Sequence, residues 1–511
     1  MLFNSVNFAI FFPIVFFIYW FIMRKSVRNQ NVFIVIASYI FYGWWDWRFL
    51  FLIFLSTIVD YTAGLGLSRT EQNRTEQNRT EQNRTEQNRT EQNRTEQNRT
   101  EQNRTIILVF SIFVNLTILG FFKYFNFFVD NFVAAFSLFG INFDVQHLKI
   151  ILPVGISFYT FQTMSYTIDV YYNKLKPTKN FIAFAAFVSF FPQLVAGPIE
   201  RAKHLLPQFY AKRCFNYSDA VDGCLQTLWG FFKKIVIADN CAIYANMIFN
   251  NYQDYSGSTL FLGAVFFSFQ IYSDFSGYSD IALGISRLFG ITLSKNFAYP
   301  YFSRNMAEFW RRWHISLSTW FKDYVYIPLG GSRRGTLYTI RNTFVIFILS
   351  GLWHGANWTF IIWGFLNAVC FLPLLLLKRN KVYTSIVAEN RTFPSIIEIF
   401  NMFCTFIITI FLWIIFRSEN INYAVRYIAK IFSPSLFSVP NFKDRIKALM
   451  TLLLILIYII VEWVGRRENF AIQNIRKIKS YRIKFSVVLI IIFAILFFGN
   501  FGENSFIYFQ F

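Results

Sequence analysis

The sequence predicts an all-α polytopic membrane protein, with about ten to twelve transmembrane helices plus re-entrant and amphipathic helices. Its 511 residues are 55% hydrophobic and only 15% charged, whereas soluble proteins carry roughly 25% charged residues. Apolar runs approaching the length of a membrane span recur along the chain, and short clusters of Lys and Arg separate them. This composition excludes an ordinary soluble multi-domain protein and a disordered chain.

The charge balance is strongly basic, with 49 Lys and Arg against 28 Asp and Glu and a net charge of +21. In a soluble protein this would indicate nucleic-acid binding, but here no basic stripe lies on a soluble module. The basic residues follow the positive-inside pattern instead, so we expect the lipid bilayer as surroundings and no nucleic-acid partner. The clusters are Arg24, Lys25 and Arg28; Lys174, Lys176 and Lys179; Arg333, Arg334 and Arg341; Lys378, Arg379 and Lys381; and Arg476, Lys477, Lys479 and Arg482.

The first apolar run, Phe8–Met23, has no basic segment before it and no small-residue cleavage site after it. We therefore expect an uncleaved first span, and Arg24 directly after it places the next loop in the cytoplasm. Several further runs are shorter than a full span, which predicts tilted or re-entrant segments. These runs are Val32–Tyr42, Phe49–Leu67, Ile106–Phe122, Ile150–Tyr172, Phe181–Ala196, Leu260–Tyr272, Thr343–Leu352, Trp358–Leu377, Ile396–Phe416, Leu449–Val464 and Phe485–Phe501.

Residues 70–104 repeat the pentapeptide TEQNR without error, 35 residues at five per copy. A five-residue period advances about 140° around a helix per copy, so like residues never line up and no apolar stripe forms. We expect a solvated low-complexity loop, disordered or a frayed helix. Each copy contains the glycosylation sequon Asn-Arg-Thr, from Asn73 to Asn103, but the expected cytoplasmic side favours repeat slippage without modification.

Several common catalytic and metal-binding patterns are missing from the sequence. The five cysteines form no CxxC pair, and no GxSxG, Walker or HExxH motif occurs, so we expect no bound metal and no serine-hydrolase mechanism. Asp274 and Asp280 resemble a calcium loop, but its twelfth position is Ile285 instead of Glu. We expect both carboxylates to hold a histidine or a backbone turn. Lys233 and Lys234 are expected to snorkel to the interface, with contact to an anionic donor as the alternative.

His354 lies between two apolar runs, at a depth where an ionisable group is costly and indicates function. Gly351 beside it allows close approach of a ligand or a backbone. We expect Trp353, Asn357 and Trp358 to line a substrate slot there. A neutral imidazole in that slot takes a proton from a hydroxyl as the hydroxyl attacks a thioester. The alternative is a core histidine that donates one hydrogen bond.

His314 falls within a predicted amphipathic helix over residues 308–324. Counting 100° per residue from Glu308, the charged side chains lie between about 300° and 80°, and His314 lies near 240°, on the apolar side with Trp310. This predicts a helix with a basic outer face at the membrane surface and an inward-pointing histidine. His314 would orient the acceptor or polarise the acyl carbonyl, unless it is an interfacial packing residue.

Long strings across nearly the whole chain resemble the membrane-bound O-acyltransferase (MBOAT) family, in its branch of bacterial alginate and peptidoglycan O-acetyltransferases. They include FYGWWDWRFL, FFPQLVAGPIERAKHLLPQ, QIYSDFSGYSDIALG, EFWRRWHISLSTWFKDYVYIPLGG, GLWHGANWTFIIWG and FIYFQF. The resemblance implies one MBOAT membrane domain over residues 1–511, into which the repeat of residues 70–104 is inserted. It places the family's invariant histidine at His354 and its second polar site residue at His314.

The resemblance also implies a fold around a central tunnel, with acetyl-CoA as the cytoplasmic acyl donor and no tightly bound cofactor. In this branch an SGNH-type partner commonly completes transfer to a polysaccharide hydroxyl outside the cell. We therefore expect an O-acetyltransferase of the inner (cytoplasmic) membrane that takes part in O-acetylation of alginate, peptidoglycan or another exopolysaccharide. The residues expected to contact substrate are Trp310, Trp353, Asn357, Trp358, Asp274 and Tyr278.

Two other functions are compatible with an apolar membrane protein that contains these two histidines. A transporter or flippase would move a glycolipid or polymer precursor through the tunnel, with the histidines as proton relays. An inactive scaffold would only recruit an enzyme partner. Within the acyltransferase interpretation, D-alanyl transfer to teichoic acid fits less well, because FIYFQF and FWRRWHIS belong to the acetyl branch.

Overall fold

In the computed structural model, every regular element among the described residues is a helix, as the sequence predicts. The chain divides into two compact units, and each contains segments that are separated in the sequence. Unit 1 comprises Met1–Val195, Ile199–Phe215 and Phe289–Leu293, and unit 2 comprises Ala196–Pro198, Asn216–Leu288 and Ser294–Phe511. The structure describes residues 1–81, 89–141, 143, 145, 147–502 and 506–507, and side chains outside residues 71–97.

Unit 1 begins with helices that start at capping serines, as helix N-termini favour. Ser5 Oγ accepts the Phe8 N–H at 3.2 Å, and Ser26 Oγ accepts the Asn29 N–H at 3.4 Å. The elements of unit 1 are α1 Val6–Phe17, η1 Ile18–Ile22, α2 Val27–Asp46, η2 Trp47–Phe49, α3 Leu50–Glu81, α4 Arg89–Leu119, η4 Gly120–Tyr124, α5 Phe125–Ser137, α6 Ile156–Tyr171, α7 Phe181–Ser189, α8 Phe191–Leu194, α9 Ala202–Leu205 and η5 Leu206–Phe209.

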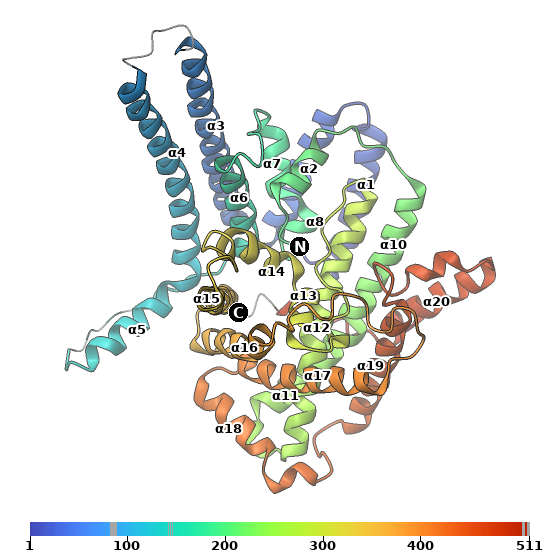
Figure 1. Ribbon diagram of the computed structural model, residues 1–511. Helices are drawn as coiled ribbons and strands as arrows, with labels where there is room; N and C mark the ends of the chain where they lie inside the picture. Colours follow the sequence, from blue (N-terminus) through green and yellow to red (C-terminus); the bar gives the residue numbers. More distant parts are fainter. Residues whose placement is uncertain (82–88, 142, 144, 146, 503–505, 508–511) are drawn as a thin grey trace. The chain divides into compact units, whose positions relative to one another are not determined.

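Helices α3 and α4 lie side by side and carry the two ends of the TEQNR repeat (Figure 1). Of the two states expected for the repeat, its described residues adopt helix; residues 82–88 lie outside the described part. A buried polar cluster joins these helices to α6. Asp60 accepts hydrogen bonds from Ser111 at 2.5 Å, Asn115 at 2.9 Å and Thr167 at 2.9 Å, which satisfies a carboxylate that burial would otherwise destabilise.

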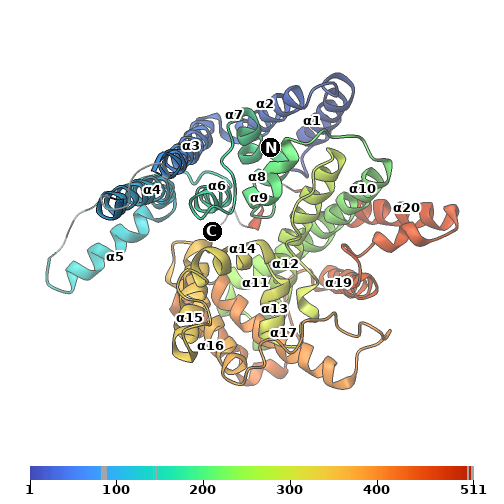
Figure 2. The same ribbon diagram turned by 45° about the horizontal axis from the view of Figure 1, so that its top comes forward.

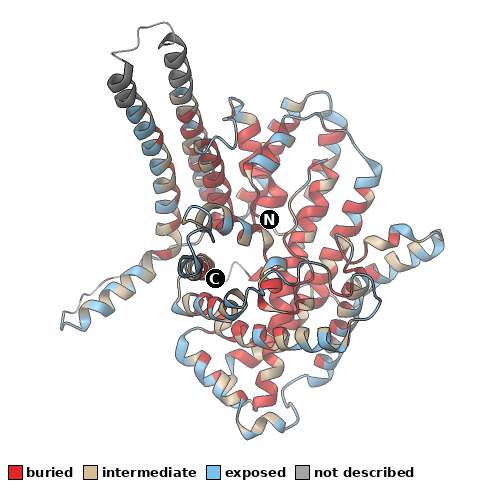
Figure 3. Cartoon of the chain, viewed as in Figure 1, coloured by how far each residue is buried: buried red, intermediate tan, exposed pale blue. Residues whose placement is uncertain are grey.

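Unit 2 is built around α12, whose residues are buried along most of its length (Figure 3). A helix surrounded by protein can carry Ser, Asp and Gln, which a lipid-facing helix cannot. Its elements are α10 Tyr217–Phe231, η6 Phe232–Ala238, α11 Asp239–Asn250, η7 Tyr252–Asp254, α12 Gly257–Leu288, η8 Pro300–Phe302, α13 Met306–Arg312, α14 Ile315–Phe321, η9 Lys322–Tyr326, α15 Thr336–His354, α16 Trp358–Leu376, α17 Ile396–Arg417, α18 Ile421–Ile431, η10 Pro434–Phe437, α19 Arg445–Gly465, η11 Gln473–Lys477 and α20 Tyr481–Phe498.

Helices α15 and α16 pack side by side with their backbones in close contact (Figure 2). A Cβ atom added to Gly351 would lie 2.2 Å from the Phe360 carbonyl oxygen, and one added to Gly364 would lie 2.3 Å from that of Phe347. Only glycine fits such contacts, so these two positions set the separation of the helices. The close approach brings His354, at the end of α15, onto the face of α16.

Six segments among the described residues are long and apolar enough to cross a membrane: Val27–Thr70, Asn98–Ser137, Trp358–Leu376, Ile396–Arg417, Arg445–Gly465 and Tyr481–Phe498. Their exposed apolar side chains suit contact with lipid; in α20, for example, Ile491 is the one described residue that is buried. The polar residues of α12 explain why this helix is not among the six. The larger number of crossings that we expect from the sequence stays a prediction.

Candidate active site

The structure brings together, within unit 2, the two histidines that the sequence analysis singled out. The ring centroids of His314 and His354 lie 6.5 Å apart, with their planes inclined at 62°. Both side chains are buried, with 1% of His314 and 4% of His354 exposed. Forty residues of sequence separate them, so the fold positions this pair.

The predicted continuous helix over residues 308–324 is wrong. Helix α13 ends at Arg312, His314 adopts a left-handed backbone conformation with φ of 44°, and α14 begins at Ile315. The cause is a neighbouring segment that hydrogen-bonds both sides of the break. The Ala298 N–H donates to the Arg312 carbonyl at 3.0 Å, and the Ile315 N–H donates to the Asn296 carbonyl at 2.9 Å. His314 does point inward, but it sits at a turn instead of on a helix face.

The arginines of the expected basic face make contacts within unit 2, and a position of this face at the membrane surface stays a prediction. Arg311 donates to the backbone carbonyls of Asn380 at 2.7 Å and Tyr383 at 2.6 Å. Arg312 pairs with the buried carboxylate of Glu308 at 2.8 Å. Arg312 also donates to the Ser385 carbonyl at 3.1 Å, so both arginines fix α13 to the segment that follows α16.

Asn296 holds the His314 ring. Its Oδ1 lies 3.0 Å from His314 Nδ1 and also accepts the Ser316 hydroxyl at 2.9 Å, while its Nδ2 donates to the Ser279 hydroxyl at 3.3 Å. An amide oxygen only accepts hydrogen bonds, so this geometry places the His314 proton on Nδ1 and the lone pair on Nε2. The ring of Phe275 packs edge-on against the imidazole at 4.7 Å.

Aromatic rings surround His354. Its ring centroid lies 5.0 Å from that of Trp353, 5.3 Å from that of Trp363 and 5.2 Å from that of Phe416, all with the planes nearly perpendicular. Trp353 also lies 5.6 Å from His314, so it contacts both imidazoles. These contacts fix the His354 ring in an apolar environment. Because His354 is buried, a tunnel that reaches it stays a prediction.

Three further residues expected at the substrate lie on α13 and α16. Trp310 Nε1–H donates to Asn367 Oδ1 at 3.2 Å, which turns its ring toward Trp363, the wall of His354. Asn357 caps the N-terminus of α16, because its side chain accepts a hydrogen bond from the Thr359 N–H at 3.0 Å; this contact stabilises the helix. Trp358 begins α16 and is 51% exposed. Substrate contact stays a prediction for each.

Asp274 and Tyr278, the other two expected substrate residues, lie on α12 next to the C-terminal segment. Asp274 Oδ2 accepts the Ile507 N–H at 2.7 Å, and the Tyr278 ring lies 4.9 Å from that of Phe506. The Phe506 ring is also 5.8 Å from Phe275, the residue that packs on His314. The described part of the FIYFQF string therefore belongs to the shell around the site.

Lys233 and Lys234 do not snorkel to the interface, which corrects the sequence-based expectation. Both are buried in ion pairs: Lys233 with Asp280 at 2.5 Å, and Lys234 with Asp274 at 2.9 Å and Asp239 at 2.8 Å. A buried ammonium group requires such partners. Asp274 and Asp280 thus pair with lysines, and Asp274 also accepts a backbone N–H; among the described residues, neither forms a hydrogen bond or ion pair with a histidine.

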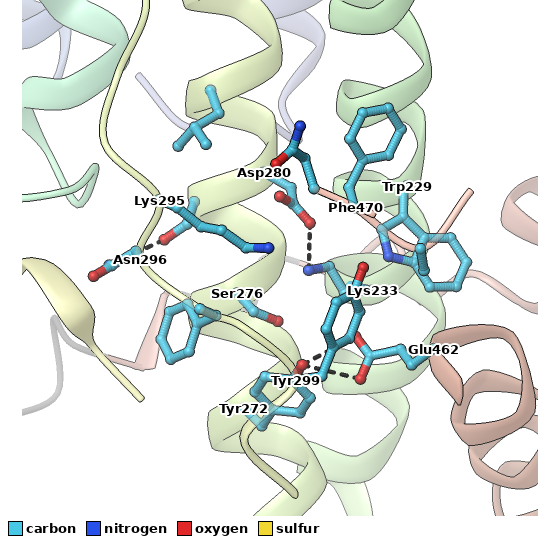
Figure 4. A pocket seen from close by; sticks show the side chains of 15 residues that line it. Trp229, Lys233, Tyr272, Ser276, Asp280, Lys295, Asn296, Tyr299, Glu462 and Phe470 are labelled. Atoms are coloured by element: carbon cyan, nitrogen blue, oxygen red, sulfur yellow. Dashed lines mark hydrogen bonds and ion pairs between the residues drawn. The ribbon is translucent and has the colours of Figure 1, made fainter. Parts of the chain in front are cut away.

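A small polar cavity of about 20 Å³ lies beside Asn296, with room for about one water molecule (Figure 4). Lys233, Asp280 and Glu462 line it, and Glu462 accepts the Tyr272 hydroxyl at 2.9 Å. Burial lowers the pKa of Lys295, also in its wall, to about 8. Asn296 therefore connects His314 to a small polar cavity that is lined by charged groups.

The sequence analysis missed Asn296, Trp363 and Phe416. Asn296 lies in the string NFAYPYF, which is close to His314 in the sequence. The sequence does not show that the Asn296 side chain contacts the His314 ring. Trp363 and Phe416 look like ordinary apolar residues of transmembrane helices. Among the residues that the structure describes, no group of three or more His, Cys, Asp or Glu side chains is arranged to hold a metal ion.

Comparison with known proteins gives the class of this chain. Residues 172–425 match the family model described as MBOAT, membrane-bound O-acyltransferase family. The probable alginate O-acetylase AlgI of Azotobacter vinelandii is 36% identical, over 92% of this chain and 86% of its own length. That of Pseudomonas aeruginosa is 36% identical, over 92% and 82%. The peptidoglycan O-acetyltransferase of Helicobacter pylori is 34% identical, over 83% and 79%.

The chain therefore belongs to the membrane-bound O-acyltransferase family. It is a multi-pass membrane protein and an O-acyltransferase, homologous to O-acetyltransferases of polysaccharides. Both histidines of the site and the residues of their immediate walls fall within the matched residues 172–425.

Proposed function

We propose that this chain moves an acetyl group from cytoplasmic acetyl-CoA across the inner membrane, for O-acetylation of an extracytoplasmic polysaccharide. The observation that carries the proposal is the buried pair of imidazoles, His314 and His354, 6.5 Å apart in the segment that matches the family. The relatives named for alginate and peptidoglycan support these acceptors, or another exopolysaccharide. In this proposal an SGNH-type partner completes the transfer outside, and about ten to twelve crossings surround a tunnel to His354.

In the proposed reaction His354 is the general base. Its imidazole takes the proton of the hydroxyl that accepts the acetyl group, either on the SGNH-type partner that passes the group on or on the polysaccharide itself. The oxygen of that hydroxyl attacks the thioester carbonyl carbon. The tetrahedral intermediate then collapses, the C–S bond breaks, and the imidazolium returns the proton to the thiolate. The acetyl ester and free coenzyme A thiol are the products, so the histidine is regenerated.

His314 assists by orientation. With its proton on Nδ1 toward Asn296, its Nε2 offers a lone pair that accepts a hydrogen bond from the acceptor hydroxyl. Of the two roles considered from the sequence, this tautomer favours holding the acceptor over polarising the acyl carbonyl, because polarisation needs a donor. Trp353, in contact with both rings, keeps the two imidazoles at a fixed separation.

The test is acetyl transfer by the purified protein in proteoliposomes, with acetyl-CoA outside and polysaccharide plus the SGNH-type protein of the same organism inside. We expect release of coenzyme A thiol that depends on the acceptor, with acetyl ester appearing on the polymer. Movement of a glycolipid without thioester cleavage would identify a flippase instead. Partner binding with neither reaction would identify a scaffold.

The contact between Asn296 and His314 predicts a shift in the pH profile. In Asn296→Asp the new carboxylate stabilises the protonated imidazolium, so Nε2 loses its lone pair at pH values where the parent protein is active. We expect the acid limb of the activity profile to move to higher pH, with activity recovered as the pH rises. In Asn296→Ala we expect roughly tenfold lower activity at every pH, since a buried hydrogen bond is lost.

Activity measured across pH 5–9 checks both variants. A profile of Asn296→Asp that coincides with that of the parent would contradict the contact. Asn469→Ala, which changes another amide in the lining of the polar cavity, serves as the control and should leave the profile in place.

A further inference from the structure

Unit 1 contains a cavity of about 540 Å³ where the first apolar helix ends. One wall is aromatic and is formed by Phe16, Trp20 and Phe21, which lie on α1 and η1. The other wall is basic and comes from two segments far apart in the sequence: Arg24, Lys25, Lys212 and Arg213. The cavity is large enough for a substantial part of a small-molecule ligand.

The basic wall has no internal counter-charge. Arg24, Lys25 and Lys212 are exposed, and Arg213 is buried with 6% of its surface accessible. Within the described part of the chain, none of these four cations forms an ion pair with a carboxylate. Four positive charges around one cavity repel one another, and an anionic ligand would relieve that repulsion.

Arg213 is held in place at the base of this wall. Its Nη2 donates to Asn31 Oδ1 at 2.6 Å, and its guanidinium lies 5.7 Å from the ring centroids of both Tyr19 and Phe209. Its Nη1 has no hydrogen-bond partner among the described residues. A fixed guanidinium with a spare donor is suited to a phosphate oxygen.

One ring of the aromatic wall is exposed and suits contact with lipid. The Phe21 side chain is 63% exposed, and Phe17 and Ile14 on the same helix are also exposed. This apolar helix is followed directly by Arg24, so the cavity is expected at the cytoplasmic interface, where the bilayer carries its anionic lipids. A ligand that fills the cavity would meet apolar rings on one side and cations on the other.

We propose that this cavity binds an anionic phospholipid of the cytoplasmic leaflet. The phosphate lies among Arg24, Lys25, Lys212 and Arg213, and an acyl chain lies along Phe16 and Phe21. A soluble nucleotide would satisfy the cations but would leave the exposed surface of Phe21 uncovered, whereas a lipid accounts for both walls. The site is independent of the histidine pair and of the proposed acetyl transfer.

The experiment compares lipid binding to the purified full-length protein by native mass spectrometry, with phosphatidylglycerol and phosphatidylcholine as probes. The test variant is Arg24→Gln/Lys25→Gln/Lys212→Gln, which leaves the buried Arg213 in place. We expect the parent to retain phosphatidylglycerol over phosphatidylcholine, and the variant to bind phosphatidylglycerol roughly 100-fold more weakly, about fivefold for each interfacial cation.

The matched control is Lys174→Gln/Lys176→Gln/Lys179→Gln, which removes three exposed charges elsewhere in unit 1 and should leave phosphatidylglycerol binding unchanged. Equal weakening in both triple variants would show non-specific attraction and overturn the proposal. Unchanged binding in the test variant would overturn it as well. Displacement of phosphatidylglycerol by coenzyme A would assign the cations to a nucleotide instead. Thermal melting of each variant verifies that the fold is retained.

Discussion

In His354→Ala we expect polysaccharide O-acetylation to fall by roughly 10²–10⁴-fold, the usual effect of removing one positioned acid–base group. The imidazole is held by the rings of Trp353, Trp363 and Phe416 at centroid distances of 5.0–5.3 Å. Because these rings also pack on other residues, the variant should still fold and insert in the membrane. Acetyl content of the polysaccharide, normalised to the amount of protein in the membrane fraction, measures the effect.

Two controls separate chemistry from packing. His354→Gln fills most of the same space but cannot act as a base, so it should lose activity as His354→Ala does. His147→Ala removes an exposed histidine of unit 1 and should leave acetylation unchanged. Full activity in His354→Ala would refute the assignment, and loss of activity with loss of the protein from the membrane would assign His354 a packing role.

Local patterns in the sequence predict the helices and the positions of the candidate site residues. Ser5 and Ser26 cap helices as their side chains favour, and the apolar runs become helices. His354 and His314 could be singled out because a histidine among apolar residues is conspicuous and because the surrounding strings resemble those of a known family. Gly351 beside His354 indicated a close approach, which α16 provides.

Long-range contacts account for what the sequence did not predict. The break before His314 depends on backbone hydrogen bonds to residues 296–298, and no periodicity in residues 308–324 encodes it. Lys233 is buried because Asp280, 47 residues away in the sequence, lies next to its ammonium group. The prediction that Lys233 extends to the membrane interface was wrong because it considered the lysine without this partner. The role of Asn296 could not be predicted for the same reason, because its hydrogen bond to His314 depends on how the fold places the two side chains.

Glu308→Ala is expected to destabilise unit 2 by roughly 3–5 kcal/mol, the cost of leaving buried charges without their partner. The Glu308 carboxylate is buried and accepts hydrogen bonds from the Arg304 N–H at 2.7 Å, from the Arg304 guanidinium at 3.0 Å and from Arg312 at 2.8 Å. It therefore closes the first turn of α13, the helix that leads into the His314 turn. Acetylation should fall together with stability, because the position of His314 depends on this helix.

Thermal unfolding of the purified protein in detergent measures the change. Glu389→Ala, which removes an exposed carboxylate of the same unit, is the matched control and should melt with the parent. In the double variant Arg304→Met/Glu308→Met the buried Arg304 guanidinium, which would retain only Glu398 as a carboxylate partner, is also removed, so part of the stability should return. If Glu308→Ala melts with the parent, the carboxylate is not needed to hold α13. If the double variant is no more stable than Glu308→Ala, the loss does not come from the incompletely paired charge of Arg304.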